Sequence, residues 1–282
     1  MHDTPPIIDI PELHLLIAQG KPVVLIDATI DKVNQRIDSK DSVPELIPDS
    51  VFMDLEEKFS DHSNPLPHTM VDDATFEREA RAMGINQDSI LVIYDRWGIY
   101  SSPRAWWMFR SMGHENTFVL QGGLPAWKEQ HLPVVSKHQS TRTIATGNFV
   151  VHPQPYFWKS KTDLLKGLEE NDTTIIDARN ANRYGGKSPE PRAGLRSGHI
   201  PSSHNLPFDE VLSGTRYKTV PELQKIFEPF IDDKSVVFSC GSGITAAIIA
   251  LAAYQIGFDH LAIYDGSWAE WGADENLPIE KE

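Results

Sequence analysis

Short apolar segments alternate with longer segments of helical character along the whole chain. Residues 23–29, 90–95 and 174–179 are rich in aliphatic side chains, and helix-like stretches such as residues 74–83 and 103–112 lie between segments of this kind. Segments that are apolar on both faces and alternate with helices are typical of a parallel sheet that helices cover on both sides. The pattern therefore predicts an α/β fold.

The chain contains this pattern twice. The second copy follows the first after about 145 residues, a distance that indicates a tandem domain rather than a short-period solenoid. The matching segments are residues 23–29 and 174–179, 47–50 and 200–203, 90–95 and 236–240, and 120–127 and 264–271. We therefore predict two domains, each a parallel sheet flanked by helices, at residues 1–135 and 149–282. The polar, aperiodic segment 136–148 is the predicted linker.

Cys240, the only cysteine, lies at the end of an apolar segment. Residues 236–239 predict a buried strand, Gly241 and Gly243 allow a tight turn, and residues 246–253 predict a helix that begins at once. A thiol there lies among the backbone N–H groups of a turn and a helix N-terminus, which bind anions and stabilise a thiolate. We interpret Cys240 as a nucleophile. An inert core cysteine is the alternative, but it does not need glycine at both positions.

The first copy of the pattern has Asp95 at the position of Cys240, followed by Arg96, Trp97 and Gly98. This copy keeps the scaffold and lacks the nucleophile. Ligands of parallel α/β sheets bind at the carboxyl ends of the strands, where Cys240 falls. We therefore expect an inactive first domain that supplies walls and a few side chains to one active site between the domains.

Composition narrows the choice of partners. The 282 residues are 40% hydrophobic and 23% charged, as in ordinary globular proteins. The formal charge of −14 argues against nucleic acid and anionic membranes, so an anionic substrate needs specifically placed cations. Residues 1–6 lack the features of a signal peptide, and no apolar run reaches membrane-spanning length. A single cysteine cannot form an internal disulfide. We therefore expect a cytoplasmic protein. The eleven histidines show no metal-ligand spacing, so we expect no metal site.

The repeat, the strand–Cys–turn–helix segment and the sequence Gly-Ser-Trp-Ala-Glu-Trp-Gly at residues 266–272 together resemble the two-domain rhodanese family of sulfurtransferases. The resemblance covers both domains. It implies that a cysteine of the C-terminal domain takes up sulfane sulfur as a persulfide and that the N-terminal domain is inactive. Thiosulfate-using members have basic residues at the second and third loop positions, whereas the mercaptopyruvate branch has Gly-Ser-Gly-Val-Thr or a near variant. The loop Cys240-Gly241-Ser242-Gly243-Ile244-Thr245 is similar to the mercaptopyruvate branch.

The charge of the loop supports this division. Thiosulfate is a compact dianion that needs cations at the loop itself, and Gly241 and Ser242 provide none. Mercaptopyruvate has its carboxylate some bonds away from its sulfur, so its cations should stand away from the loop. The resemblance assigns this role to Arg183 and Arg192, and the planar guanidinium group of arginine suits bidentate binding of a carboxylate. The alternative is that both are ordinary loop arginines paired with Glu190 or solvent.

The mercaptopyruvate branch also places a serine, a histidine and an acid near the cysteine. By resemblance these correspond to Ser242, to His68 and, with a less clean alignment around residues 54–61, to Glu56. Such a relay would orient Ser242 and move a proton to the departing enolate. The alternatives are an exposed loop histidine and a serine that merely fits the turn.

The implied reaction has two halves and needs no metal or organic cofactor. The Cys240 thiolate attacks the sulfur of 3-mercaptopyruvate, a small anionic donor, and pyruvate leaves by way of its enolate. The amides of residues 241–246 then hold the negative persulfide until a thiol, thioredoxin or cyanide takes the outer sulfur. The substrate-binding members of the loop are therefore Gly241, Gly243, Ile244 and Thr245. We expect the protein to be a monomer.

Three rival functions stay open from the sequence. A thiosulfate sulfurtransferase is disfavoured by the uncharged loop. A cysteine phosphatase would need a longer loop with an arginine, and the sixth residue after Cys240 is Ala246. A non-catalytic sulfur carrier would retain Cys240 without needing Arg183 and Arg192.

Overall fold

Two parallel sheets, one in each half of the chain, form the framework of the molecule. The computed structural model describes residues 5–33, 35–38, 43–230, 234–258 and 260–282. Within these residues each main sheet has five strands, in the orders β1-β5-β4-β2-β3 and β6-β12-β11-β7-β8. All strand pairs inside the two sheets are parallel. The two orders are the same when corresponding strands are matched, which confirms the predicted repeat and the predicted α/β fold.

The first half alternates strands with helices, as the hydrophobic pattern predicts. Its strands are β1 (Ile7–Ile8), β2 (Val23–Asp27), β3 (Val51–Phe52), β4 (Ile90–Tyr94) and β5 (Thr117–Leu120). Its helices are α1 (Ile10–Ala18), α2 (Asp73–Ala82), α3 (Ser102–Ser111) and α4 (Gly123–Glu129). Local sequence sets several boundaries: Asp9 and Glu12, for example, form a capping box that begins α1.

The second half repeats this arrangement. Its main strands are β6 (Trp158–Lys159), β7 (Thr173–Asp177), β8 (His204–Asn205), β11 (Ser235–Ser239) and β12 (Leu261–Tyr264), and β9 (Leu212–Ser213) pairs with β10 (Arg216–Tyr217) in a separate hairpin. Its α-helices are α5 (Lys161–Glu170), α6 (Ala181–Tyr184), α7 (Val220–Phe227), α8 (Ile244–Gln255) and α9 (Ser267–Trp271). Short 3₁₀ helices lie at Pro155–Phe157, Phe208–Val211 and Glu228–Phe230.

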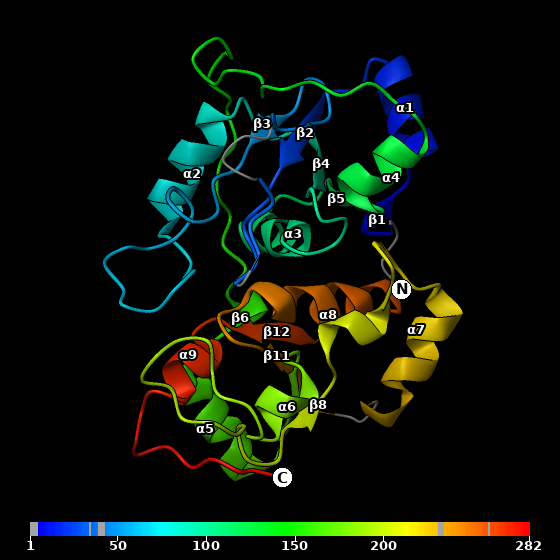
Figure 1. The fold of residues 1–282 in the computed structure, drawn as a ribbon. Helices are drawn as coiled ribbons and strands as arrows, with labels where there is room; N and C mark the ends of the chain where they lie inside the picture. Colours follow the sequence, from blue (N-terminus) through cyan, green and yellow to red (C-terminus); the bar gives the residue numbers. More distant parts are fainter. Residues whose placement is uncertain (1–4, 34, 39–42, 231–233, 259) are drawn as a thin grey trace.

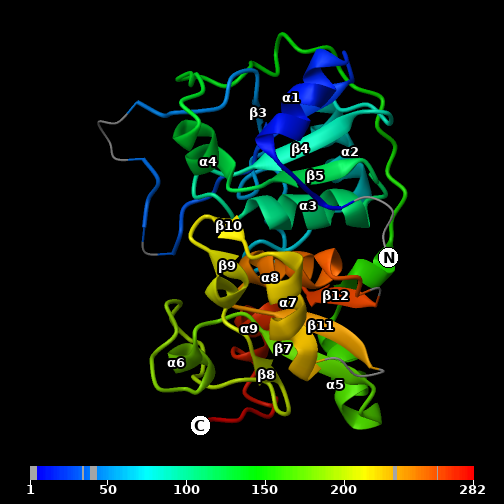
Figure 2. The ribbon, with the colours of Figure 1, turned by 90° about the vertical axis from the view of Figure 1, so that its right-hand side faces the viewer.

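Helices α3 and α8 pack against each other where the two halves meet (Figures 1 and 2). Every residue of α3 except Arg110 is buried, and α8 is buried at Ile244 and throughout residues 246–253. A helix that is apolar all round needs apolar neighbours on every side, and α8 has its own sheet on one side and α3 on the other. The two halves thus share one continuous hydrophobic core.

The predicted linker lies along the first half. His138 Nε2 is 2.9 Å from Asp27 Oδ2, the Gln139 N–H donates to the Ser50 carbonyl at 2.8 Å, and the Gly147 N–H donates to the Arg81 carbonyl at 2.9 Å. These contacts fix the path of the segment before the chain enters the second half.

None of the helices in the described residues combines the length and the apolar character that a bilayer crossing requires.

Candidate active site

Cys240 follows β11 directly, and α8 begins at Ile244. Between them the chain turns at Gly243, whose φ of +80° lies in the left-handed region that favours glycine. The turn directs two amides at the thiol: the N–H groups of Ser242 and Gly243 donate to Cys240 Sγ at 3.5 and 3.1 Å. The predicted strand–turn–helix is confirmed. It holds a nearly buried sulfur, 2% exposed as a residue, among backbone donors at the carboxyl edge of the sheet.

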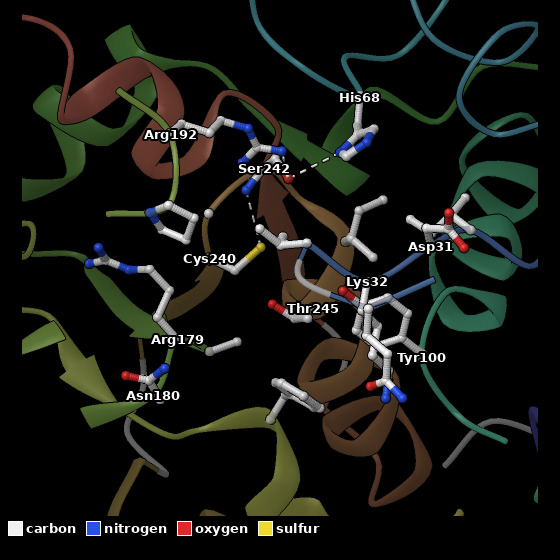
Figure 3. A pocket seen from close by; sticks show the side chains of 18 of the residues that line it. Asp31, Lys32, His68, Tyr100, Arg179, Asn180, Arg192, Cys240, Ser242 and Thr245 are labelled. Atoms are coloured by element: carbon white, nitrogen blue, oxygen red, sulfur yellow. Dashed lines mark hydrogen bonds between the residues drawn. The ribbon is translucent and has the colours of Figure 1, made fainter. Parts of the chain in front are cut away.

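A cleft of about 660 Å³ lies over this sulfur, between the two halves of the molecule (Figure 3). The first half contributes residues 30–33, 35 and 36, together with Glu56, His68 and Tyr100. The second half contributes residues 178–180, Arg183, Pro191, Arg192, Phe208, residues 240–242, Ile244 and Thr245. Except for Gly243, which forms the turn behind Cys240, every site residue that the sequence predicts therefore faces one cavity.

Ser242 joins the two halves at the mouth of the loop. Its Oγ lies 3.0 Å from His68 Nδ1, and Arg192 Nη2 donates to the same oxygen at 3.4 Å (Figure 3). Burial, together with the nearby cations of Arg104 and Arg192, lowers the pKa of His68 to about 4, although Asp265 acts in the opposite direction. His68 is therefore a neutral hydrogen-bonding partner of Ser242 near pH 7.

Arg183 and Arg192 stand over the glycine of the loop. A Cβ at Gly241 would lie 3.1 Å from Arg183 Nη2, which is a tight contact, and 3.8 Å from Arg192 Nη1, which is an ordinary one, so the missing side chain leaves room for the Arg183 guanidinium group. Burial lowers the pKa of Arg192, while a charge on Cys240 would raise it. The cleft thus holds two cations next to Gly241, although the loop sequence itself has none.

The two arginines differ in their partners. Arg183 pairs with Glu190, with Nη2 to Oε2 at 2.5 Å and Nε to Oε1 at 3.2 Å, so the pairing considered from sequence is present for this residue. The Glu190 side chain is only 1% exposed and also binds Arg179, which is anchored in turn on Asp177 at the end of β7. This chain of alternating charges connects Arg183 to the sheet and points its guanidinium group at the cleft.

Comparison with known proteins gives the family. A sequence profile described as a rhodanese-like domain matches residues 9–130 and again residues 160–274. This chain belongs to the rhodanese family. A 3-mercaptopyruvate sulfurtransferase of Escherichia coli K12 is 41% identical over 236 residues, which is 83% of each chain. A thiosulfate/3-mercaptopyruvate sulfurtransferase of Arabidopsis thaliana is 36% identical over 83% of this chain and 67% of its own length.

The fold of this rhodanese is also that of a solved relative. The crystal structure of SseA from Escherichia coli, described as a 3-mercaptopyruvate sulfotransferase, superimposes with a TM-score of 0.83 at 34% identity. The match covers 94% of this chain and 99% of SseA. Both domains of the rhodanese fold are therefore present here.

Glu56 lies in the cleft of the rhodanese but apart from the Ser242–His68 pair. Within the described residues no hydrogen bond joins Glu56 to His68. Burial raises the pKa of Glu56, and the nearby charges of Asp31, Asp54 and Glu57 raise it as well. Its assignment as the acid of the relay stays a prediction.

Two charged residues near His68 do not follow from the sequence reasoning. Arg104 of α3 donates to the His68 carbonyl at 2.7 Å and also to Asp265, which follows β12, at 2.7 Å. One signal for the burial of Arg104 was available in the sequence: this charged residue directly precedes the apolar run Ala105-Trp106-Trp107-Met108-Phe109. In the described part of the chain, no cluster of three or more His, Cys, Asp or Glu side chains is arranged to hold a metal ion.

Proposed function

We propose that this protein is a 3-mercaptopyruvate sulfurtransferase, which moves sulfur from 3-mercaptopyruvate to Cys240 and then to a thiol, thioredoxin or cyanide. The observation that carries the proposal is the cleft itself: an uncharged loop around the sulfur, with Arg183 and Arg192 standing over it. This arrangement suits a donor whose carboxylate is some bonds away from its sulfur. The relatives named for this activity support the same conclusion.

The first half-reaction forms the persulfide. The Cys240 thiolate attacks the mercapto sulfur, a sulfur–sulfur bond forms, and the carbon–sulfur bond breaks with its electron pair on the carbon of the pyruvate enolate. The enolate takes up one proton to become pyruvate, and the outer sulfur loses one, which leaves a negative persulfide. We propose that Ser242 and His68 carry this proton from the outer sulfur to the enolate.

The amides of the turn hold the persulfide until an acceptor arrives. The Ser242 and Gly243 N–H groups already point at Sγ, and Gly241, Ile244 and Thr245 complete the loop at the head of α8. Backbone donors at a helix N-terminus stabilise such an anion without a side-chain cation. The acceptor thiolate then attacks the outer sulfur and returns the Cys240 thiolate, which closes a ping-pong cycle.

Division of labour between the domains is part of the proposal. We assign the inactive domain to residues 1–135, the linker to residues 136–148 and the catalytic domain to residues 149–282. Asp95 at the cysteine position supports an inactive first domain. Since both halves of a single chain line the cleft, one chain suffices for the site, and we propose a monomer that size-exclusion chromatography with light scattering would test. A cytoplasmic location stays a prediction.

Thiosulfate is the second candidate donor. The Arabidopsis relatives are named for both thiosulfate and 3-mercaptopyruvate. In this cleft the two guanidinium groups stand close enough to Gly241 to meet some of the charge of a dianion. We therefore expect thiosulfate to be used less well, because neither loop position next to Cys240 has a cation.

Two measurements test the proposal. Intact mass after incubation with 3-mercaptopyruvate, without acceptor, should show about 32 Da added at one site, the mass of one sulfur atom on the cysteine. Steady-state kinetics with cyanide as acceptor should give a higher kcat/KM for 3-mercaptopyruvate than for thiosulfate. The reverse order would favour the second candidate, and no added mass with either donor would reject sulfur transfer through Cys240.

A further inference from the structure

Arg104 is a buried cation that the inactive domain places behind the active loop. It lies on α3, its side chain is 1% exposed, and every other residue of this helix except Arg110 is buried. A single guanidinium nitrogen, Nη2, donates both to the His68 carbonyl and to Asp265 Oδ1, each at 2.7 Å. The guanidinium group also stacks over the Trp158 ring, 4.6 Å from its centroid.

The second terminal nitrogen of Arg104 faces the Cys240 loop. Nη1 is buried and has no hydrogen-bond partner among the described residues. A Cβ at Gly243 would lie 2.9 Å from Nη1, closer than real Cβ atoms approach such an atom. Arg104 thus lies directly against the turn whose Gly243 N–H donates to Cys240 Sγ.

Asp265 completes a connection between three segments. Its Oδ1 accepts from Arg104, and its Oδ2 accepts from the Met70 N–H at 2.9 Å. The segment that contains His68 and Met70, and α3 of the first half, are thereby joined to the β12–α9 connection of the second half. Apolar residues can fill the place of a buried ion pair at little cost in stability, so stability alone does not explain this pair.

We propose that Arg104 is a positioning residue for sulfur transfer, which fixes His68 against Ser242 and supports the Cys240 loop at Gly243. This inference rests on the proposed function. The backbone of His68 needs such support, because its φ of +60° is unfavourable for a residue with a side chain. The hydrogen bond from Arg104 to the His68 carbonyl holds that backbone conformation and, with it, the direction of the ring.

A matched pair of variants separates positioning from general support of the domain interface. Arg110 is on the same helix and also crosses to the second half, where its Nη2 donates to the Tyr254 hydroxyl at 3.2 Å, at the end of α3 away from the loop. We expect Arg104→Met to lower kcat/KM for 3-mercaptopyruvate about 10- to 100-fold, mainly through kcat, as for a lost charge-assisted contact. Arg110→Met should change it by less than about threefold.

Recovery of activity by added guanidinium distinguishes a loss of positioning from a loss of folding. Arg104→Ala should regain activity in millimolar guanidinium, which can occupy the vacated site, whereas Cys240→Ser should not. Arg104→Lys, which keeps the cation but loses the planar fork, should fall between wild type and Arg104→Met. Loss of activity in Arg104→Met no greater than in Arg110→Met, or no rescue of a folded Arg104→Ala, would overturn the inference.

The position of His68 can be followed without any sulfur donor, so failure of the proposed function and of this inference are distinguishable. NMR titration of labelled histidine should find the pKa of His68 near 4 in wild type. In Arg104→Met this pKa should rise, because one nearby cation is lost while Asp265 stays and Arg192 is unchanged. An unchanged His68 signal in folded Arg104→Met would contradict the inference even if the enzyme transfers sulfur.

Discussion

The two halves of the molecule use the same turn in opposite ways. In the first half Asp95 follows β4, and its carboxylate accepts hydrogen bonds from the N–H groups of Trp97, Tyr100, Ser101 and Ser102 at 2.8–3.0 Å, and from the Ser102 hydroxyl at 2.7 Å. In the second half Cys240 occupies the corresponding position, and two amides face its sulfur. Both turns are therefore anion-binding cradles.

The difference lies in what fills the cradle. The first cradle contains a carboxylate of its own chain, which occupies its donors permanently. The second contains a sulfur that can gain and lose an atom. The first turn is also longer, because α3 begins only at Ser102 whereas α8 begins at Ile244. The first turn thus holds a fixed carboxylate where the second holds a thiol, and the first half lines the cleft with Glu56, His68, Tyr100 and residues 30–33, 35 and 36.

Replacement of the sulfur gives the largest expected effect. Cys240→Ser should remove sulfur transfer to below roughly a thousandth of the wild-type rate, because a serine hydroxyl does not ionise near pH 7 and cannot hold a sulfane sulfur. The fold should persist, since the two side chains are of similar size. Steady-state kinetics and circular dichroism check both points. Appreciable turnover by a folded Cys240→Ser protein would contradict the assignment of Cys240 as the reactive residue of the second turn.

Removal of the cations over the loop should have the next largest effect. Arg183→Ala or Arg192→Ala should reduce kcat/KM for 3-mercaptopyruvate about 10- to 100-fold, the equivalent of one lost charge-assisted contact. The loss should appear mainly in KM if the carboxylate is held equally in the ground and transition states. Thiosulfate turnover should fall less, because thiosulfate has no carboxylate.

Kinetics of both arginine variants with both donors make this test decisive. Arg196, which donates to the Trp271 and Gly272 carbonyls away from the cleft, offers a control on the same segment of chain. Equal losses on the two donors would remove the carboxylate assignment. No loss on either donor would return Arg183 and Arg192 to the role of ordinary loop residues.

The carboxylate behind Arg183 should matter less for activity than the arginine itself. Glu190→Gln keeps the shape of the side chain but removes the charge that holds both Arg179 and Arg183. We expect a several-fold rise in KM for 3-mercaptopyruvate and a loss of roughly 3 kcal/mol in the free energy of unfolding, since a buried pair loses one partner. Thermal unfolding and steady-state kinetics measure the two effects. An unchanged KM would show that Arg183 needs no anchor.

What the sequence predicted well depends on short stretches of chain. The Cys240 turn and the α/β repeat were predictable because a strand, a glycine turn and a helix succeed one another within a few residues. The resemblance to the rhodanese family assigned His68 and Arg192, which are far apart in the sequence, to one site, and both line the same cleft. Contacts such as Arg104 with Asp265 were not predictable, because nothing in either local sequence indicates a partner in the other domain. The pairing of Arg183 with Glu190 was only one of two alternatives, since the loop conformation that decides between them depends on tertiary packing.

The smallest expected change in sulfur transfer comes from giving the first cradle a thiol. Asp95→Cys should still take up about one sulfur, or about 32 Da, per chain, because Arg183 and Arg192 line the cleft at Cys240 and Asp95 is fully buried. The variant should lose roughly 3 kcal/mol or more of stability, since several buried N–H groups lose their ionised acceptor. Asp95→Asn, which keeps the shape and one oxygen acceptor, should lose less. Intact mass and chemical denaturation of both variants check these expectations. Uptake of a second sulfur by Asp95→Cys would mean that the first cradle is competent and that only its carboxylate keeps it inactive.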